Sequence, residues 1–206
     1  MNARAPRDRF VGEIAAFGTT LGHRIVIGSW RSSRFGPFAD IMHESPDGLR
    51  TLHAPTDAVA RYVSETYEFD QVCVGPITAD RGRSELIVTS GEWALRVTIG
   101  RRTLLGRGLR LVPEPVATAP WWCRAIDPIA RRVQRGVSTR GTARAGRVES
   151  YGAVDQHHLD AVSAKLRGDD LGSIADVDPP VRFGFSSAPR SPCIVAITTT
   201  IERADR

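Results

Sequence analysis

Short segments of strand-forming residues, each ended by a turn, follow one another closely through the first half of this chain. HRIVIGSW (23–30), FADIMHE (38–44) and LRTLHA (49–54) are rich in aliphatic and aromatic side chains, which favour strands. Pro46 and Gly48 supply the turn between the last two, because proline presets φ and glycine accepts a left-handed backbone. Strands joined this tightly pair antiparallel. The sequence therefore predicts hairpins rather than crossovers.

The same pattern continues along the chain. Further strands are predicted at 71–77, 84–90, 92–100 and 147–154, and a closing hairpin at 179–187 and 191–202. Apolar residues at helical spacing predict a helix over 57–67 after an N-cap at Thr56, and a second over 119–134 with a break or a kink at Asp127, before Pro128. We therefore expect an α+β fold: a largely antiparallel sheet or partly closed barrel with two or three helices, formed by residues 1–206 as one domain.

Composition limits the environment and the cofactors. The sequence lacks the roughly 18 consecutive apolar residues of a membrane helix, and MNARAPRDRF lacks the apolar part of a signal peptide. Cys73, Cys123 and Cys193 are odd in number and widely spaced, which indicates reduced thiols in a cytoplasmic protein. Neither the cysteines nor the histidines have ligand spacing along the chain, so we expect no metal and no cofactor.

The charge of the chain permits anion binding without indicating it. The net charge is +5, and Lys165 is the only lysine among 28 basic residues. Arginine is dense from 96 to 147, where only Glu114 and Asp127 oppose it, and such a surplus attracts anions. The sequence contains no phosphate loop, dinucleotide fingerprint, nucleophile elbow or zinc finger. Lys165 is followed by two aspartates, which favours an exposed, ordinary lysine.

The segment ESYGAVDQHHLD (149–160) is the richest in groups that transfer protons or bind metals. Residues 156–167 fit either a strand or a helix that ends at Gly168, and the sequence does not decide between them. In both cases His157 and His158 point apart, which disfavours a paired-histidine metal site. In a strand, Asp155 and His157 share a face, as a carboxylate and the imidazole that it orients would.

Alternation along the preceding residues predicts a polar face. In a strand, Arg147, Glu149 and Tyr151 point to one side and Val148 to the other. Because Val148 suits a core, the polar side must face solvent or a cavity. Of the adjacent Trp121 and Trp122, only one can pack into the core, so we expect Trp122 to form an apolar wall near these groups.

The first predicted hairpin carries a secondary candidate pair. If its turn closes between Glu44 and Leu49, Asp40 lies opposite His53 and could form a carboxylate–imidazole pair. A slip of one residue in the register would separate them.

Several segments of the second half resemble uncharacterised conserved proteins from actinobacteria: LGRGLRLVPEP (105–115), GRVESYGAVD (146–155), LRGDDLG (166–172) and VRFGFSSAPRSP (181–192). That resemblance implies no particular activity. The order of hairpins is similar to the cone-shaped barrel of acetoacetate decarboxylase relatives, but no segment matches the catalytic lysine segment of that family.

Two functions fit these observations. The first is binding, with or without turnover, of a small anionic organic molecule in a sheet-lined pocket formed by Arg147, Glu149, Tyr151, Trp122, Asp155 and His157. The alternative is an interaction module that uses its arginine-rich surface to bind nucleic acid or an acidic protein; nucleic acid is the less favoured partner, because stacking aromatics are scarce. A membrane partner is not expected, and the sequence leaves monomer and homodimer open.

Overall fold

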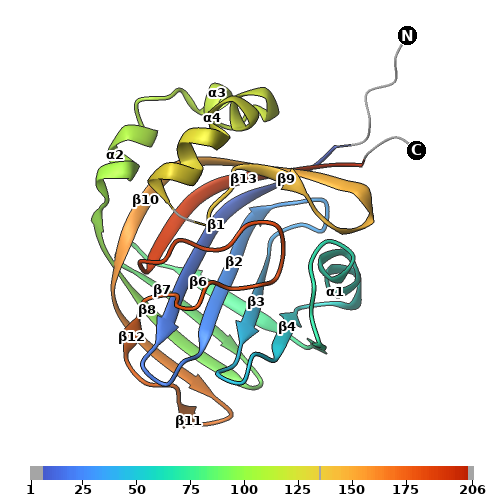
Figure 1. The fold of residues 1–206 in the computed structure, drawn as a ribbon. Helices are drawn as coiled ribbons and strands as arrows, with labels where there is room; N and C mark the ends of the chain where they lie inside the picture. Colours follow the sequence, from blue (N-terminus) through green and yellow to red (C-terminus); the bar gives the residue numbers. More distant parts are fainter. Residues whose placement is uncertain (1–6, 135, 204–206) are drawn as a thin grey trace.

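One curled sheet dominates the structure (Figure 1). The computed structural model describes residues 7–134 and 136–203. Within them, ten strands follow the order β5-β4-β3-β2-β1-β13-β10-β8-β7-β6, and three short ones pair at the edges: β9 and β11 with β10, and β12 with β1. The strands are β1 Arg7–Thr19, β2 Arg24–Ser32, β3 Phe38–Glu44, β4 Arg50–Ala54, β5 Gln71–Val74, β6 Ile77–Arg81, β7 Glu85–Ser90, β8 Trp93–Arg102, β9 Arg140–Thr142, β10 Arg147–Leu166, β11 Asp169–Asp170, β12 Ile174–Ala175 and β13 Cys193–Arg203.

Helices cover part of this sheet: α1 Asp57–Ser64, α2 Leu104–Leu109, α3 Glu114–Ala117 and α4 Pro120–Val133, with a 3₁₀ turn at Arg144–Gly146. Neighbouring strands pair antiparallel except β4 and β5, which are parallel. The predicted α+β class and the largely antiparallel sheet are confirmed. None of the helices in the described ranges has the length and apolarity needed to cross a bilayer.

The two faces of the sheet have different neighbours. The sheet curls until β6 contacts β3, and the inner face of the curl holds the largest core cluster, including Phe17, Ile27, Leu86 and Trp93. The outer face lies under α1, α4 and the segment 181–189. The central strands are therefore buried on both sides, which is why GEIAAFG and CIVAI are apolar without strict alternation.

Strand β10 resolves the ambiguity at 156–167. The segment is a strand throughout, paired with β13 along its first half and with β8 along its second. Register shifts between Ala153 and Asp155, and on either side of Leu159, let it bend from one partner to the other. Ladder pairing, mainly with β8, outweighs the weak helix preference of its alanines and leucine.

Two predicted features of the second half are wrong. Residues 179–187 form no strand; they are an irregular segment, and β13 pairs with β1 and β10 instead. Helix α4 is continuous through Pro128, so there is no break at Asp127, and the alternative of a kink there stays a prediction. The middle of the helix is fastened to the segment that follows it, because Thr139 donates from its backbone N–H to Asp127 Oδ1 at 2.7 Å and from its hydroxyl to the carbonyl of Cys123 at 2.7 Å.

Candidate functional site

A cavity of about 400 Å³ lies between the outer face of the sheet and the elements that cover it. Strands β1, β2, β3, β10 and β13 form its floor, and α2, α4 and the segment 181–189 form much of its cover. Its size suits a small organic molecule. Most lining side chains are apolar, among them Ile14, Val26, Met42, Leu109, Ile126, Val133, Val195 and Ile197.

Asp40 is the one lining residue with a carboxyl group, and no arginine, lysine or histidine lines the cavity within the described ranges. Its side chain is only 2% exposed. Trp30 Nε1–H donates to Asp40 Oδ1 at 2.9 Å. Burial raises the pKa of Asp40 to about 7, although the hydrogen bond from Trp30 opposes the shift. Asp40 can therefore gain or lose a proton near neutral pH.

The absence of a side chain at position 28 makes room for this pair. Gly28 is the cross-strand partner of Asp40, and a Cβ there would lie 2.4 Å from Asp40 Oδ1 and 2.6 Å from Trp30 Nε1. The hydrogen bond between Trp30 and Asp40 consequently lies flat across β2. Any larger residue at 28 would displace one of the two groups.

A second buried carboxyl group is held by two tyrosines. Glu149 is fully buried, and its Oε2 lies 2.7 Å from the Tyr151 hydroxyl and 3.0 Å from the Tyr67 hydroxyl. The two hydroxyls are 2.9 Å apart, and both tyrosines line the cavity. Burial raises the pKa of Glu149 to about 7, against the tyrosine hydrogen bonds and the charge of Arg147, which lower it.

The number of hydrogens shared by Glu149, Tyr67 and Tyr151, the carboxyl–tyrosine triad, favours a protonated Glu149. With an ionised Glu149 the two phenols supply only two hydrogens for the three contacts, so one contact would join two oxygens with no hydrogen between them. A protonated Glu149 brings a third hydrogen, so each of the three contacts can hold one in a closed ring. The neutral triad satisfies every group and leaves the tyrosine oxygens able to accept a further hydrogen bond.

Tyr67 connects the two carboxyl groups. Burial is the main cause that raises its pKa, and the charges of both Glu149 and Asp40 add to the shift. Asp40 is therefore within electrostatic reach of the triad. The ring of Tyr151 is held by stacking on Phe185, at 5.5 Å between centroids. The arrangement places two phenol hydroxyls at the cavity wall with one titratable carboxyl group behind them.

The cysteines of the cavity do not add a nucleophile. Cys123 and Cys193 both line it, and burial raises the pKa of each thiol to about 11. Since the thiolate is the reactive form, both are inert at neutral pH.

Arg147 lies on the same side of β10 as Glu149 but does not line the cavity. It donates to the Tyr62 carbonyl at 2.9 Å, forms an ion pair with Glu65, and its guanidinium lies 4.4 Å from the Tyr62 ring centroid. Its role in the structure is to fasten the end of α1 to the sheet. The predicted polar face of β10 exists, but its arginine is committed to protein groups.

The two tryptophans have different surroundings. Trp122 lines the cavity from α4, whereas Trp121 is exposed and contacts Trp122 edge to face at 5.9 Å. Trp122 is therefore part of the cavity lining, and its role as an apolar wall for a ligand stays a prediction.

Asp155 and His157 share a face of β10 but lie outside the cavity lining. Asp155 forms an ion pair with Arg102 at 2.8 Å, and His157 Nε2 is 3.6 Å from Asp155 Oδ2. His157 Nδ1 is also 3.1 Å from the carbonyl oxygen of Gly100. These contacts describe a satisfied surface network between β8 and β10.

The predicted pairing of Asp40 with His53 is wrong by one residue. His53 lies opposite Ile41, and Glu44 lies opposite Arg50, because the turn contains five residues, 45–49, closed by a bond from Ser45 N to the Leu49 carbonyl. Side chains alternate along a strand, so Asp40 faces the cavity and His53 faces the inner side of the curl. Burial lowers the pKa of His53.

The arginine-rich interval is extensively paired with acidic residues from elsewhere in the chain. Arg102 pairs with Asp155, Arg140 with Glu202, and Arg147 with Glu65. Arg131 pairs with Asp127 within α4. Much of the local positive charge is thereby offset in the folded protein.

Comparison with known proteins gives little that bears on function. No family model matches the sequence, and no curated protein matches it. Among solved structures, an acetoacetate decarboxylase from Legionella pneumophila is similar, with 10% sequence identity, a TM-score of 0.46, and coverage of 98% of this chain and 90% of that one. The predicted relation to actinobacterial proteins stays a prediction.

Proposed function

We propose that the protein binds a small, largely apolar organic molecule in the cavity above the sheet. The observation that carries this proposal is an apolar lining with one titratable carboxyl group, Asp40, and two tyrosine hydroxyls that are bonded to a second, Glu149, behind the lining. An apolar body would fill the space, and the few polar groups would orient it. The acceptor oxygens of Asp40, Tyr67 and Tyr151 favour a ligand whose polar end donates hydrogen bonds.

This proposal differs from the sequence-based one in the charge of the ligand. An anion would enter a site lined by a carboxyl group and, within the described ranges, by no cationic side chain. Burying an unpaired charge there would cost several kcal/mol, roughly as for other isolated buried ions. A neutral ligand avoids that cost, and a cationic one can offset it by pairing with the ionised form of Asp40.

A matched pair of fluorescent probes tests the proposal. N-phenyl-1-naphthylamine is neutral and carries one N–H donor, and 1-anilinonaphthalene-8-sulfonate has the same rings with an added sulfonate. We expect the neutral probe to bind saturably and at least about tenfold more tightly, equivalent to ~1.4 kcal/mol. Absence of saturable binding, or preference for the sulfonate, would contradict the proposal.

Filling the cavity should abolish this binding. Ala153 lines the cavity from β10, so Ala153→Phe is expected to lower the affinity for the neutral probe by at least about tenfold. Ala161 lies on the same strand, is exposed and is outside the lining, so Ala161→Phe is the matched control. Equal binding by the two variants would place the probe elsewhere.

The Tyr151 hydroxyl should contribute a modest share of affinity. Removing it in Tyr151→Phe opens the ring formed with Glu149 and Tyr67 and removes one acceptor from the cavity. We expect probe affinity to fall by about 0.5–1.5 kcal/mol, the range for one neutral hydrogen bond. His158→Gln, at an exposed position of the same strand, should leave affinity unchanged. The reverse result would mean that the other face of β10 binds the probe.

A further inference from the structure

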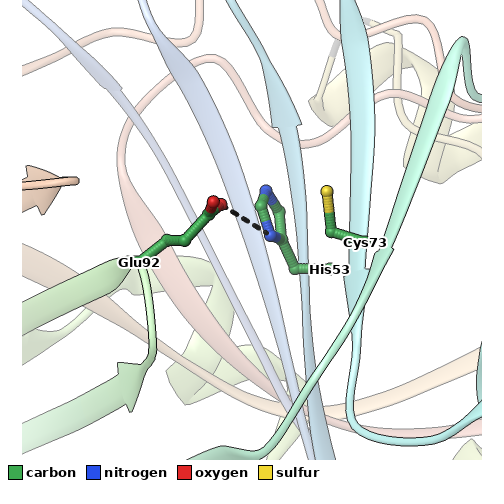
Figure 2. A group of neighbouring side chains, drawn as sticks. All are labelled: His53, Cys73 and Glu92. Atoms are coloured by element: carbon green, nitrogen blue, oxygen red, sulfur yellow. Dashed lines mark ion pairs between the residues drawn. The ribbon is translucent and has the colours of Figure 1, made fainter.

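Three side chains of the metal-binding type meet on the inner side of the curled sheet. His53 lies on β4, Cys73 on β5 and Glu92 in the turn between β7 and β8, and Figure 2 shows the His53 ring between the other two. One ligand atom from each residue lies within 4.8 Å of those from the other two. The parallel register of β4 and β5 sets His53 beside Cys73, and the curl brings Glu92 across to them.

The carboxylate of Glu92 is oriented from outside this group. Arg167 donates to Glu92 Oε1 from Nε at 3.0 Å and pairs with the same oxygen through Nη2 at 2.8 Å. The second oxygen, Oε2, is shielded from solvent and has no hydrogen-bond partner among the described residues. It lies 3.9 Å from His53 Nδ1, which is too far for a hydrogen bond.

The imidazole of His53 is held in place but not satisfied by Glu92. It is 7% exposed and packs edge to face against Trp93, with 5.5 Å between ring centroids. A buried acceptor without a partner is unfavourable, because it has lost its hydrogen bonds to water. The Glu92 oxygen, the His53 nitrogen and the Cys73 sulfur therefore lie close together, and no hydrogen bond joins His53 to Glu92. A metal ion between them could accept an electron pair from each.

We propose that His53, Cys73 and Glu92 bind one divalent transition-metal ion, with Zn²⁺ as the best match. Thiolate, imidazole and carboxylate are its usual protein ligands, at bond lengths of about 2.0–2.3 Å. Tetrahedral geometry with those lengths sets ligand atoms roughly 3.3–3.8 Å apart. Small side-chain rotations would bring the three atoms to that separation. A fourth position remains for water, because Cys73 and Glu92 are only partly buried.

This metal site is separate from the proposed ligand cavity. His53 and Asp40 point to opposite faces of the sheet, so either site can be present without the other. The expectation of no metal from the sequence depended on ligand spacing along the chain. Here the ligands come from three distant positions that only the parallel β4–β5 pair and the curl bring together.

Cobalt substitution tests the site directly. Untagged protein stripped with chelator is titrated with Co²⁺, and a thiolate-to-cobalt charge-transfer band should grow to one equivalent and be displaced by Zn²⁺. Cys73→Ser, His53→Gln and Glu92→Gln should each lower affinity by more than about 100-fold, since loss of an outer orienting contact alone costs roughly 10–100-fold. Arg167→Ala, which removes such a contact, should fall within that smaller range.

Two controls keep the result interpretable. His158→Gln and Glu85→Gln change exposed or partly exposed groups away from the site and should bind Co²⁺ as the unaltered protein does. If Cys73→Ser does not fold, the unaltered protein still tests the site. Zn²⁺ should protect Cys73 from alkylation and leave the alkylation rates of Cys123 and Cys193 unchanged. Absence of a thiolate band, no protection of Cys73, or full affinity in any of the three ligand variants would overturn the proposed ligand set.

Discussion

We expect Glu44→Ala to lower the free energy of unfolding by about 3–5 kcal/mol, the range for removing one partner of a buried ion pair. Glu44 is fully buried and accepts from Arg182 Nε at 3.0 Å and Nη2 at 2.8 Å. Its Oε1 is also 3.4 Å from Nη2 of Arg24, whose side chain is 5% exposed. Without Glu44, Arg24 would keep its charge in the interior and lose its carboxylate.

The same change should also loosen the cover of the cavity. Arg182 belongs to the segment 181–189, and its neighbours Val181 and Phe183 line the cavity. Glu44 accepts from the backbone N–H of Arg182 at 3.1 Å, so it fastens this irregular segment to the end of β3. We therefore expect weaker probe binding in the variant together with its lower stability.

Denaturant unfolding measures the first effect. Glu85→Ala is the matched control, because Glu85 forms an exposed ion pair with Arg96, and such pairs contribute about 0–1 kcal/mol. A loss for Glu44→Ala that is no greater than the loss for Glu85→Ala would show that the Arg24 charge finds another partner or reaches water.

The fold was largely predictable because local patterns determine its hairpins. The segments at 23–30, 38–44 and 49–54 become β2, β3 and β4, and the turn chemistry at Pro46 and Gly48 correctly joins two of them. The register between β3 and β4 could not be predicted as well from the sequence. One extra residue in the turn shifts the pairing of the two strands by one position. Neither the hydrophobic pattern nor residue propensities predict the length of a turn to within one residue.

The cavity was only partly predictable for a related reason. Alternation along β10 correctly places Glu149 and Tyr151 on one face, but it cannot name the residues that meet them. Tyr67 follows the end of α1 and reaches Glu149 across the sheet. Thr199, which also lines the cavity and has a buried hydroxyl with no partner in the described ranges, belongs to an ordinary-looking strand. Long-range contacts of this kind have no local signature.

The second large effect that we expect concerns pH. We compare the free energy of unfolding of Asp40→Asn with that of the unaltered protein. This difference should rise in favour of the variant by about 3–5 kcal/mol between pH 4 and pH 8. The folded-state pKa of Asp40 is about 7, above its ordinary value of 3.8, because of burial. The folded state therefore holds the proton more tightly than the unfolded chain does.

The sign follows from this difference in proton binding. A carboxyl group with a raised folded-state pKa favours folding fully below about pH 4, and this contribution is lost as pH rises to about 7. Asparagine resembles the protonated carboxyl, can still accept from Trp30 Nε1, and does not titrate. The other groups that titrate in this window, His43 with a pKa lowered by burial to about 4 among them, are present in both proteins and cancel in the difference.

Asp70→Asn is the matched control, because the pKa of Asp70 shifts the other way. Its hydrogen bonds from Arg50 lower the pKa to about 2, so its stabilising effect is lost only as pH falls from about 4 to about 2. Between pH 5 and pH 8 the stability of Asp70→Asn relative to the unaltered protein should stay constant, while that of Asp40→Asn rises. Chemical unfolding at several pH values measures both. A difference in stability that does not change with pH for Asp40→Asn would mean that Asp40 ionises in the folded protein as readily as in the unfolded chain. That would require water or a cation beside the carboxylate in the cavity. It would also remove the main electrostatic reason for excluding anionic ligands.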